Sequence, residues 1–190
     1  MIDYRKEDNV LFSQLESMAL SCGAKGAVVI PAEEIVTSTE FRRICESNSC
    51  GKYDRCWVCP PHIGRIEELI PQIYQYPFAL LYQTVSDLED SFDIEGMMKA
   101  GVDHAALSQR LQGLCRDLLK KNFLHLSCGG CHLCEQCSKV SDEPCRKPDQ
   151  ALPSLEGYGV DVYQTVRNTT LRYINGTNTV TYFGMILFEE

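Results

Sequence analysis

Nine of the eleven cysteines in this chain of 190 residues fall in two short segments, and this clustering constrains the fold more than any other feature. The first loop spans residues 45–62 and the second loop spans residues 128–150. Neither shows the period of a strand or a helix. The odd cysteine count and the N-terminus, which lacks a signal pattern, predict a cytoplasmic protein with reduced thiols. We therefore expect these thiols to bind a metal.

The second loop contains five regularly placed cysteines: Cys128, Cys131, Cys134, Cys137 and Cys145. The first four, separated by two-residue gaps, are called the cysteine ladder below. Ferredoxins use a similar run, in which three thiolates converge on one cubane cluster and a distant cysteine supplies the fourth. Zinc sites usually take two C-x2-C pairs with a longer spacer, so the ladder favours an iron–sulfur cluster over zinc. The ladder has two possible registers, starting at Cys128 or at Cys131.

The first loop contains four cysteines with irregular gaps: Cys45, Cys50, Cys56 and Cys59. Pro60 and Pro61 follow directly and hold the chain extended, as does the proline that shields a ferredoxin cluster. The spacing of this loop does not by itself choose between zinc and iron–sulfur. The ladder elsewhere in the chain favours a pair of clusters.

The remaining metal-binding residue types have plainer interpretations. Cys22 ends the first predicted helix and Cys115 lies on an apolar helical stripe, so both are expected in the core. The chain has four histidines: His62, His104, His125 and His132. For each of them a role other than metal binding is favoured. His62, which directly follows the proline pair, is the best placed of the four to be a ligand. Trp57 is expected either to cover a cluster or to anchor the core.

Hydrophobic periodicity and turn residues predict alternating helices and strands. Helices are expected at 3–22, within 32–44, at 65–75 with Pro71 kinking or ending it, from 94 to 118 and at 162–170; strands are expected at 27–31, 78–85, 122–127 and 179–188. Asn175-Gly176 is a hairpin signal. This order predicts an α/β fold, with a layered mixed sheet of about four or five strands and helices around it. A single domain over residues 1–190 is expected.

Charge and hydropathy restrict the partners. The chain has 18 Lys and Arg against 26 Asp and Glu, a net charge of −8, which argues against nucleic acid or an anionic membrane as a partner. No apolar run approaches the roughly 20 residues of a membrane span. The acidic stretch 87–95 would suit a basic redox partner, but a solvated linker before a helix is the simpler interpretation.

Three blocks of the sequence resemble a known family. The first contains Cys45, Cys50 and YDRCWVCPPH; the second is GGCHLCEQCSKVSDEPCRKPDQALPSLEGYGVDV; the third is TYFGMILFE. With these blocks, the chain from about residue 25 onward is similar to the "predicted metal-binding protein" family, a domain of unknown function in anaerobic bacteria and archaea. The resemblance implies metal binding without a settled activity.

The resemblance also implies a set of metal ligands: Cys45, Cys50, Cys59, Cys131, Cys134, Cys137 and Cys145. Cys56 and Cys128 fall where the family has no expected ligand. The chain also carries Asp54 where the family has glycine and Gly157 where it has alanine. The fourth ligand of the first site is therefore open among Cys56, Cys128 and Cys145.

Three functions are compatible with these features. The leading hypothesis is an iron–sulfur protein with one or two [4Fe–4S] clusters that exchanges electrons with a protein redox partner. The first alternative is an interaction module stabilised by zinc. The second is an iron–sulfur enzyme in which one cluster iron lacks a protein ligand and stays open. The sequence shows no arrangement of catalytic residues.

Overall fold

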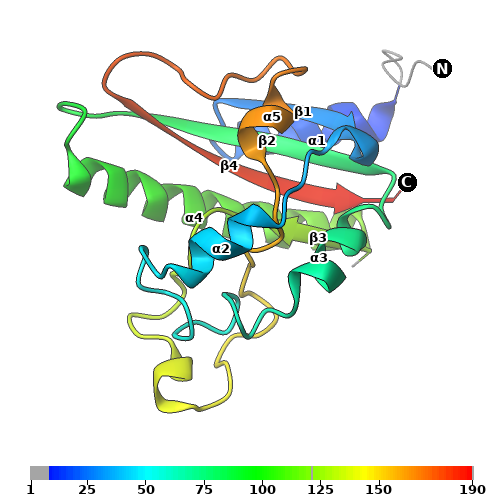
Figure 1. The fold of residues 1–190 in the computed structure, drawn as a ribbon. Helices are drawn as coiled ribbons and strands as arrows, with labels where there is room; N and C mark the ends of the chain where they lie inside the picture. Colours follow the sequence, from blue (N-terminus) through cyan, green and yellow to red (C-terminus); the bar gives the residue numbers. More distant parts are fainter. Residues whose placement is uncertain (1–8, 121, 190) are drawn as a thin grey trace.

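The computed structural model describes residues 9–120 and 122–189. Within these residues four strands form one sheet in the order β1-β2-β4-β3: β1 (Gly26–Pro31), β2 (Phe78–Asp87), β4 (Thr179–Phe188) and β3 (Phe123–Leu126). The long central strands β2 and β4 pair over their whole length, with Phe78 opposite Phe188 and Asp87 opposite Thr179. Figure 1 shows these two long strands crossing the molecule side by side.

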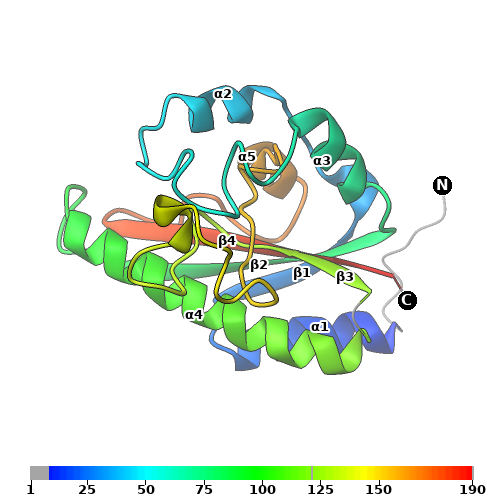
Figure 2. The ribbon, with the colours of Figure 1, turned by 90° about the horizontal axis from the view of Figure 1, so that it is seen from below.

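Helices cover both faces of the sheet (Figure 2). One face carries α1 (Val10–Ser21) and the long α4 (Ile94–Leu118); the other carries α2 (Glu40–Glu46), α3 (Ile66–Ile73) and α5 (Val162–Val166). Two single-turn 3-10 helices complete the described elements: η1 (Ala32–Glu34) and η2 (Ser138–Ser141). Among the helices of the described residues, none combines the length and apolar character needed to cross a membrane.

The apolar run of β2 explains the two covered faces. Leu81 belongs to the core under α3, whereas Leu80 and Tyr82 belong to the core under α1 and α4. All three side chains are fully buried. Successive residues of a strand point to opposite faces, so a continuous apolar run requires a packed layer on each side. Each such buried aliphatic side chain contributes about 1.5–3 kcal/mol to folding.

Short polar side chains fix where the helices begin. Asn9 accepts hydrogen bonds from the first turn of α1, and Asp93 accepts one from the Gly96 amide at the start of α4. Asp161 accepts a hydrogen bond of 2.9 Å from the Gln164 amide at the start of α5. The acidic residue Asp93 thus has a local structural role as a helix cap.

The predicted α/β architecture is confirmed, and so are the four predicted strands. The sheet is not mixed, however, because each pairing between its strands is antiparallel. The helix α4 connects β2 to β3, and these two strands run in the same direction, as expected of a strand–helix–strand unit. They do not pair with each other, because β4 lies between them and is antiparallel to both. The order of strands in space, which local pattern does not determine, accounts for the difference.

Some boundaries and one turn differ from prediction. The first helix, predicted at 3–22, is observed as Val10–Ser21. Residues 3–8 of the predicted range lie outside the described residues. Pro71 does not end α3, which continues to Ile73, and α5 ends early at Val166. The predicted hairpin at Asn175-Gly176 is wrong, because the described element directly before this turn is the helix α5 and β4 pairs with β2 and β3.

Candidate metal centre

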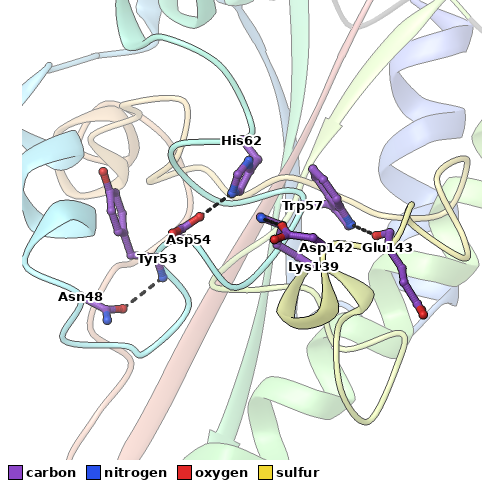
Figure 3. A network of polar contacts seen from close by, with 8 residues as sticks. All are labelled: Asn48, Tyr53, Asp54, Trp57, His62, Lys139, Asp142 and Glu143. Carbon is purple, nitrogen blue, oxygen red and sulfur yellow. Dashed lines mark hydrogen bonds and ion pairs between the residues drawn. The ribbon is translucent and has the colours of Figure 1, made fainter.

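The two cysteine loops lie side by side at one end of the molecule (Figures 1 and 2). The indole Nε1 of Trp57 in the first loop donates a hydrogen bond of 2.9 Å to the Glu143 carbonyl in the second. The Lys139 ammonium lies 5.2 Å from the centre of the Trp57 ring, and Lys139 is also paired with Asp142. Figure 3 shows these contacts. Trp57 therefore joins two segments that lie more than eighty residues apart in the chain.

Cys56 lies where the loops meet and is almost fully buried. The pKa of its thiol is lowered, mainly by a hydrogen bond with the Cys59 thiol. The backbone amides of Cys131 and Val58 and the thiol of Cys137 lower the pKa further, against the opposing effect of burial. The sulfur of Cys56 thus contacts cysteines of both loops.

The other cysteines of the first loop gather around Cys59. The pKa of Cys59 is raised, first by its hydrogen bond with Cys56 and then by burial. The negative charges of Cys56, Cys50 and Cys45 raise it further, so all four thiols of this loop act on one another electrostatically. Cys45 lies within α2, so the predicted loop begins inside a helix.

Three ladder cysteines form a second neighbourhood. Burial is the main cause that raises the pKa of Cys131, and the charges of Cys56, Cys137 and Cys134 add to it. Cys56 is therefore common to both neighbourhoods. Cys131, Cys134 and Cys137 are each partly exposed, so their thiols are accessible to a bound group.

Two candidate ligands lie apart from these neighbourhoods. Burial, together with the negative charge of Glu156, raises the pKa of Cys128 to about 12. Its charge acts on Tyr82 and Tyr182 next to α4. Cys145 takes part in none of the thiol contacts described above. The structure thus brings together seven of the nine predicted site cysteines and places Cys128 against the core side of the loop.

The cysteines predicted to be structural lie in the core. Cys115 is fully buried in the layer under α4, and Cys22 packs against the same layer with partial exposure. His104 and His125 are also buried, beside Tyr82. His132 lies between ladder cysteines, and burial lowers its pKa.

The donor set suits a soft metal centre. Thiolates bind zinc and iron–sulfur clusters in preference to harder ions. Within residues 9–120 and 122–189, no three Cys, His, Asp or Glu side chains converge tightly enough to hold a single ion. Sulfurs around one zinc lie about 3.8 Å apart, given Zn–S bonds of about 2.3 Å, whereas a cubane spaces its thiolates more widely. The loops thus gather the donors, and a bound group has to set their final geometry.

Residues 28–188 match a family model described as predicted metal-binding protein (DUF2284). The chain belongs to this family. The match confirms the family resemblance of the sequence, and it supports metal binding without naming the metal. No curated protein and no solved structure matches the chain.

The structure explains one departure from the family pattern of these predicted metal-binding proteins. Asp54 has a φ of 55°, in the left-handed region that glycine adopts most readily and that Asp tolerates better than most residues. Its carboxylate lies 2.7 Å from Nε2 of His62 (Figure 3). His62 also packs edge-on against Trp57, with ring centres 5.1 Å apart. His62 is thus engaged within its own loop.

The second departure, Gly157, permits a close approach between segments. A methyl group at this position would lie 3.2 Å from the Ser154 hydroxyl and 3.3 Å from the Ile63 side chain. The Gly157 carbonyl also accepts a hydrogen bond from Arg42, which donates a second one to the Gly64 carbonyl. Arg42 in α2 therefore ties the first loop to the segment that follows the second.

Proposed function

We propose that this protein holds [4Fe–4S] clusters in its two loops and exchanges single electrons with a protein partner. One site would use the four thiols of the first loop: Cys45, Cys50, Cys56 and Cys59. The other would use Cys131, Cys134, Cys137 and, after movement of its segment, Cys145. A [4Fe–4S] cluster supplies a carrier of one electron at a time. The observation that carries the proposal is the position of Cys56, whose sulfur contacts cysteines of both loops.

The surroundings of Cys56 support a redox role for the pair of sites. Because Cys56 belongs to both neighbourhoods, the two bound groups would be close neighbours. The backbone amides of Cys131 and Val58 point at the Cys56 sulfur. Amide donors to cluster sulfurs stabilise the more negative, reduced state and raise its potential. Trp57 and Lys139 would limit access of water on one side.

The charge of the chain indicates the kind of partner. Its net charge is −8, and thiolate-bound clusters add further negative charge. A partner with a basic surface would be attracted over a distance, and the attraction would weaken as salt is added. A cytoplasmic redox protein with such a surface is the partner we propose.

Metal analysis under anaerobic conditions tests the proposal. Protein expressed anaerobically in a host that assembles clusters should contain iron and acid-labile sulfide in about equal amounts, and should absorb near 400 nm. Dithionite should bleach this absorbance and produce a paramagnetic signal. A colourless protein with stoichiometric zinc and no sulfide would refute the proposal and establish the zinc-stabilised module instead.

A ladder variant tests the assignment of the second site. Cys134→Ala should lose about one cluster's worth of iron and sulfide, because a central thiolate of the ladder is removed. Cys22→Ala is the matched control, since Cys22 packs against the core far from both loops. Unchanged iron in Cys134→Ala would contradict the ladder assignment.

A further inference from the structure

A pocket of about 280 Å³ lies between α4 and the cysteine ladder. We call it the ladder pocket. Ala105 and Ala106 of α4 form one wall, and Leu133 and Leu152 are among the residues that line it. Ser127, at the end of β3, also lines it. The pocket therefore combines apolar walls with one well-buried hydroxyl group, and its other polar lining side chains are Gln109, Cys128, Cys131 and His132.

A chain of buried polar groups runs from this hydroxyl through the core. Ser127 Oγ lies 3.1 Å from Ser108 Oγ, which lies 2.7 Å from the hydroxyl of Tyr82. That hydroxyl lies 2.7 Å from Nε2 of His125, and Nδ1 of His125 lies 2.9 Å from Oε1 of Gln112. Tyr82 and Ser108 are wholly inaccessible to solvent. The chain thus opens into the ladder pocket at Ser127.

The direction of the protons in this chain determines what Ser127 offers a ligand. Each hydroxyl has one proton to donate and two lone pairs to accept with. The Ser108 hydroxyl donates its one proton to the His104 carbonyl, 3.0 Å away, so its contact with Ser127 requires Ser127 to donate. Ser127 therefore donates inward and has lone pairs left for a ligand. Such a serine suits a ligand that donates a hydrogen bond, such as a hydroxyl group.

Charge and volume narrow the class of ligand further. Of the residues that line the pocket in the described part of the chain, none is Asp, Glu, Lys or Arg, which favours an uncharged ligand. An apolar cavity of roughly 150 Å³ holds one benzene ring. The volume of about 280 Å³ is therefore large enough for a molecule with one or two rings.

We propose that the ladder pocket binds a neutral molecule of one or two rings through a hydroxyl group that donates a hydrogen bond to Ser127. The pocket adjoins the second metal site, because Cys131 is among the residues that line it, so binding is measured together with the metal content of the protein. The polar chain would have a purely structural role if no ligand bound, so the test has to detect the oxygen contact itself.

Three probes with the same two-ring frame provide that test. 1-Tetralone carries a carbonyl, 1-tetralol carries a hydroxyl, and tetralin carries no oxygen. None of them adds to thiols or accepts electrons readily, so the cysteines do not interfere. Calorimetric titration of the anaerobically purified protein should show saturable binding of all three. A hydrogen bond donated to Ser127 should make the alcohol bind about two- to tenfold more tightly than tetralin and the ketone.

Three variants locate the binding. Ser127→Ala should remove the advantage of 1-tetralol over tetralin and 1-tetralone. Ala106→Trp places a large side chain over the pocket and should weaken binding of all three probes at least tenfold. Leu114→Trp is the matched control, because Leu114 is an exposed residue of α4 outside the pocket, and it should leave all affinities unchanged.

The outcomes separate this proposal from the proposed function. Absence of saturable binding, wild-type affinity in Ala106→Trp, or equal affinity of the native protein for tetralin and 1-tetralol would each overturn the ligand site. The last comparison needs no variant and holds even if Ser127→Ala fails to fold. Iron, sulfide and zinc are measured in the same samples, so a failed metal assignment is visible independently of the titration.

Discussion

At the scale of the residue, Cys56 is the position whose role the structure changes most. The family resemblance implies no ligand here, yet the Cys56 sulfur contacts Cys59 in its own loop and Cys137 in the other. If Cys56 completes the first site, Cys56→Ala should leave an incomplete cluster. Iron per chain should fall by about one to four atoms, and an oxidised three-iron signal is expected in electron paramagnetic resonance.

The matched control for this change is Cys128→Ala. Cys128 interacts with Tyr82 and Tyr182 and not with the first loop, so its removal should leave iron and sulfide content unchanged. Unaltered iron in Cys56→Ala would show that Cys56 is not a ligand, so the first site takes its fourth ligand from Cys145 or has three thiols alone. Three thiols alone would leave an open cluster iron, as in an enzyme.

Tyr82 provides a second prediction at this scale. Tyr82→Phe removes the hydroxyl that contacts both Ser108 and Nε2 of His125, and leaves these buried groups without that partner. The free energy of unfolding should fall by about 1–3 kcal/mol, as measured by denaturant titration. Tyr182→Phe should cost less, because that partly exposed hydroxyl donates only to the Met97 carbonyl. Equal losses would contradict the importance of the buried chain.

At the scale of the element, sequence pattern predicts individual helices and strands, but it does not predict contacts between segments that are distant in the chain. The helical stripe places Cys115 in the core correctly, and the alternation near residue 123 predicts β3. The position of β4 between β2 and β3 depends on contacts between distant segments, as does the contact of Trp57 with Glu143. Ladder spacing indicates a cluster, but no local signal shows that the two loops meet.

The contact between the loops yields a prediction about cluster lifetime. Trp57→Phe keeps a ring but removes the Nε1–H donor to the Glu143 carbonyl. A hydrogen bond contributes about 1 kcal/mol, so the loops should separate about fivefold more often. An iron chelator should then bleach the absorbance near 400 nm about fivefold faster. Tyr53→Phe is the control on the same loop, and an equal rate in both variants would refute this role of Trp57.

At the scale of the whole molecule, the sheet and α4 separate two kinds of chemistry. Thiols gather in the loops at one end, whereas His104, His125 and Tyr82 form a polar layer within the core under α4. A buried imidazole is costly to charge, and this cost acts on the stability of the entire fold. The pH dependence of stability therefore reports on that layer.

Burial lowers the pKa of His104 to about 4, and burial together with the charge of His104 lowers that of His125 to about 3. In the unfolded chain a histidine takes up a proton near pH 6.5. Between about pH 6.5 and pH 3 the unfolded state binds more protons, so the free energy of unfolding should fall as the pH falls through this range. Denaturant titrations at pH 7 and pH 5 should show the loss.

His125→Gln, which cannot gain that proton, should lose less stability between these two pH values than the native chain. An equal loss in both proteins would mean that His125 is not held neutral in the fold, and His104 would then remain as the buried histidine that explains the acid sensitivity.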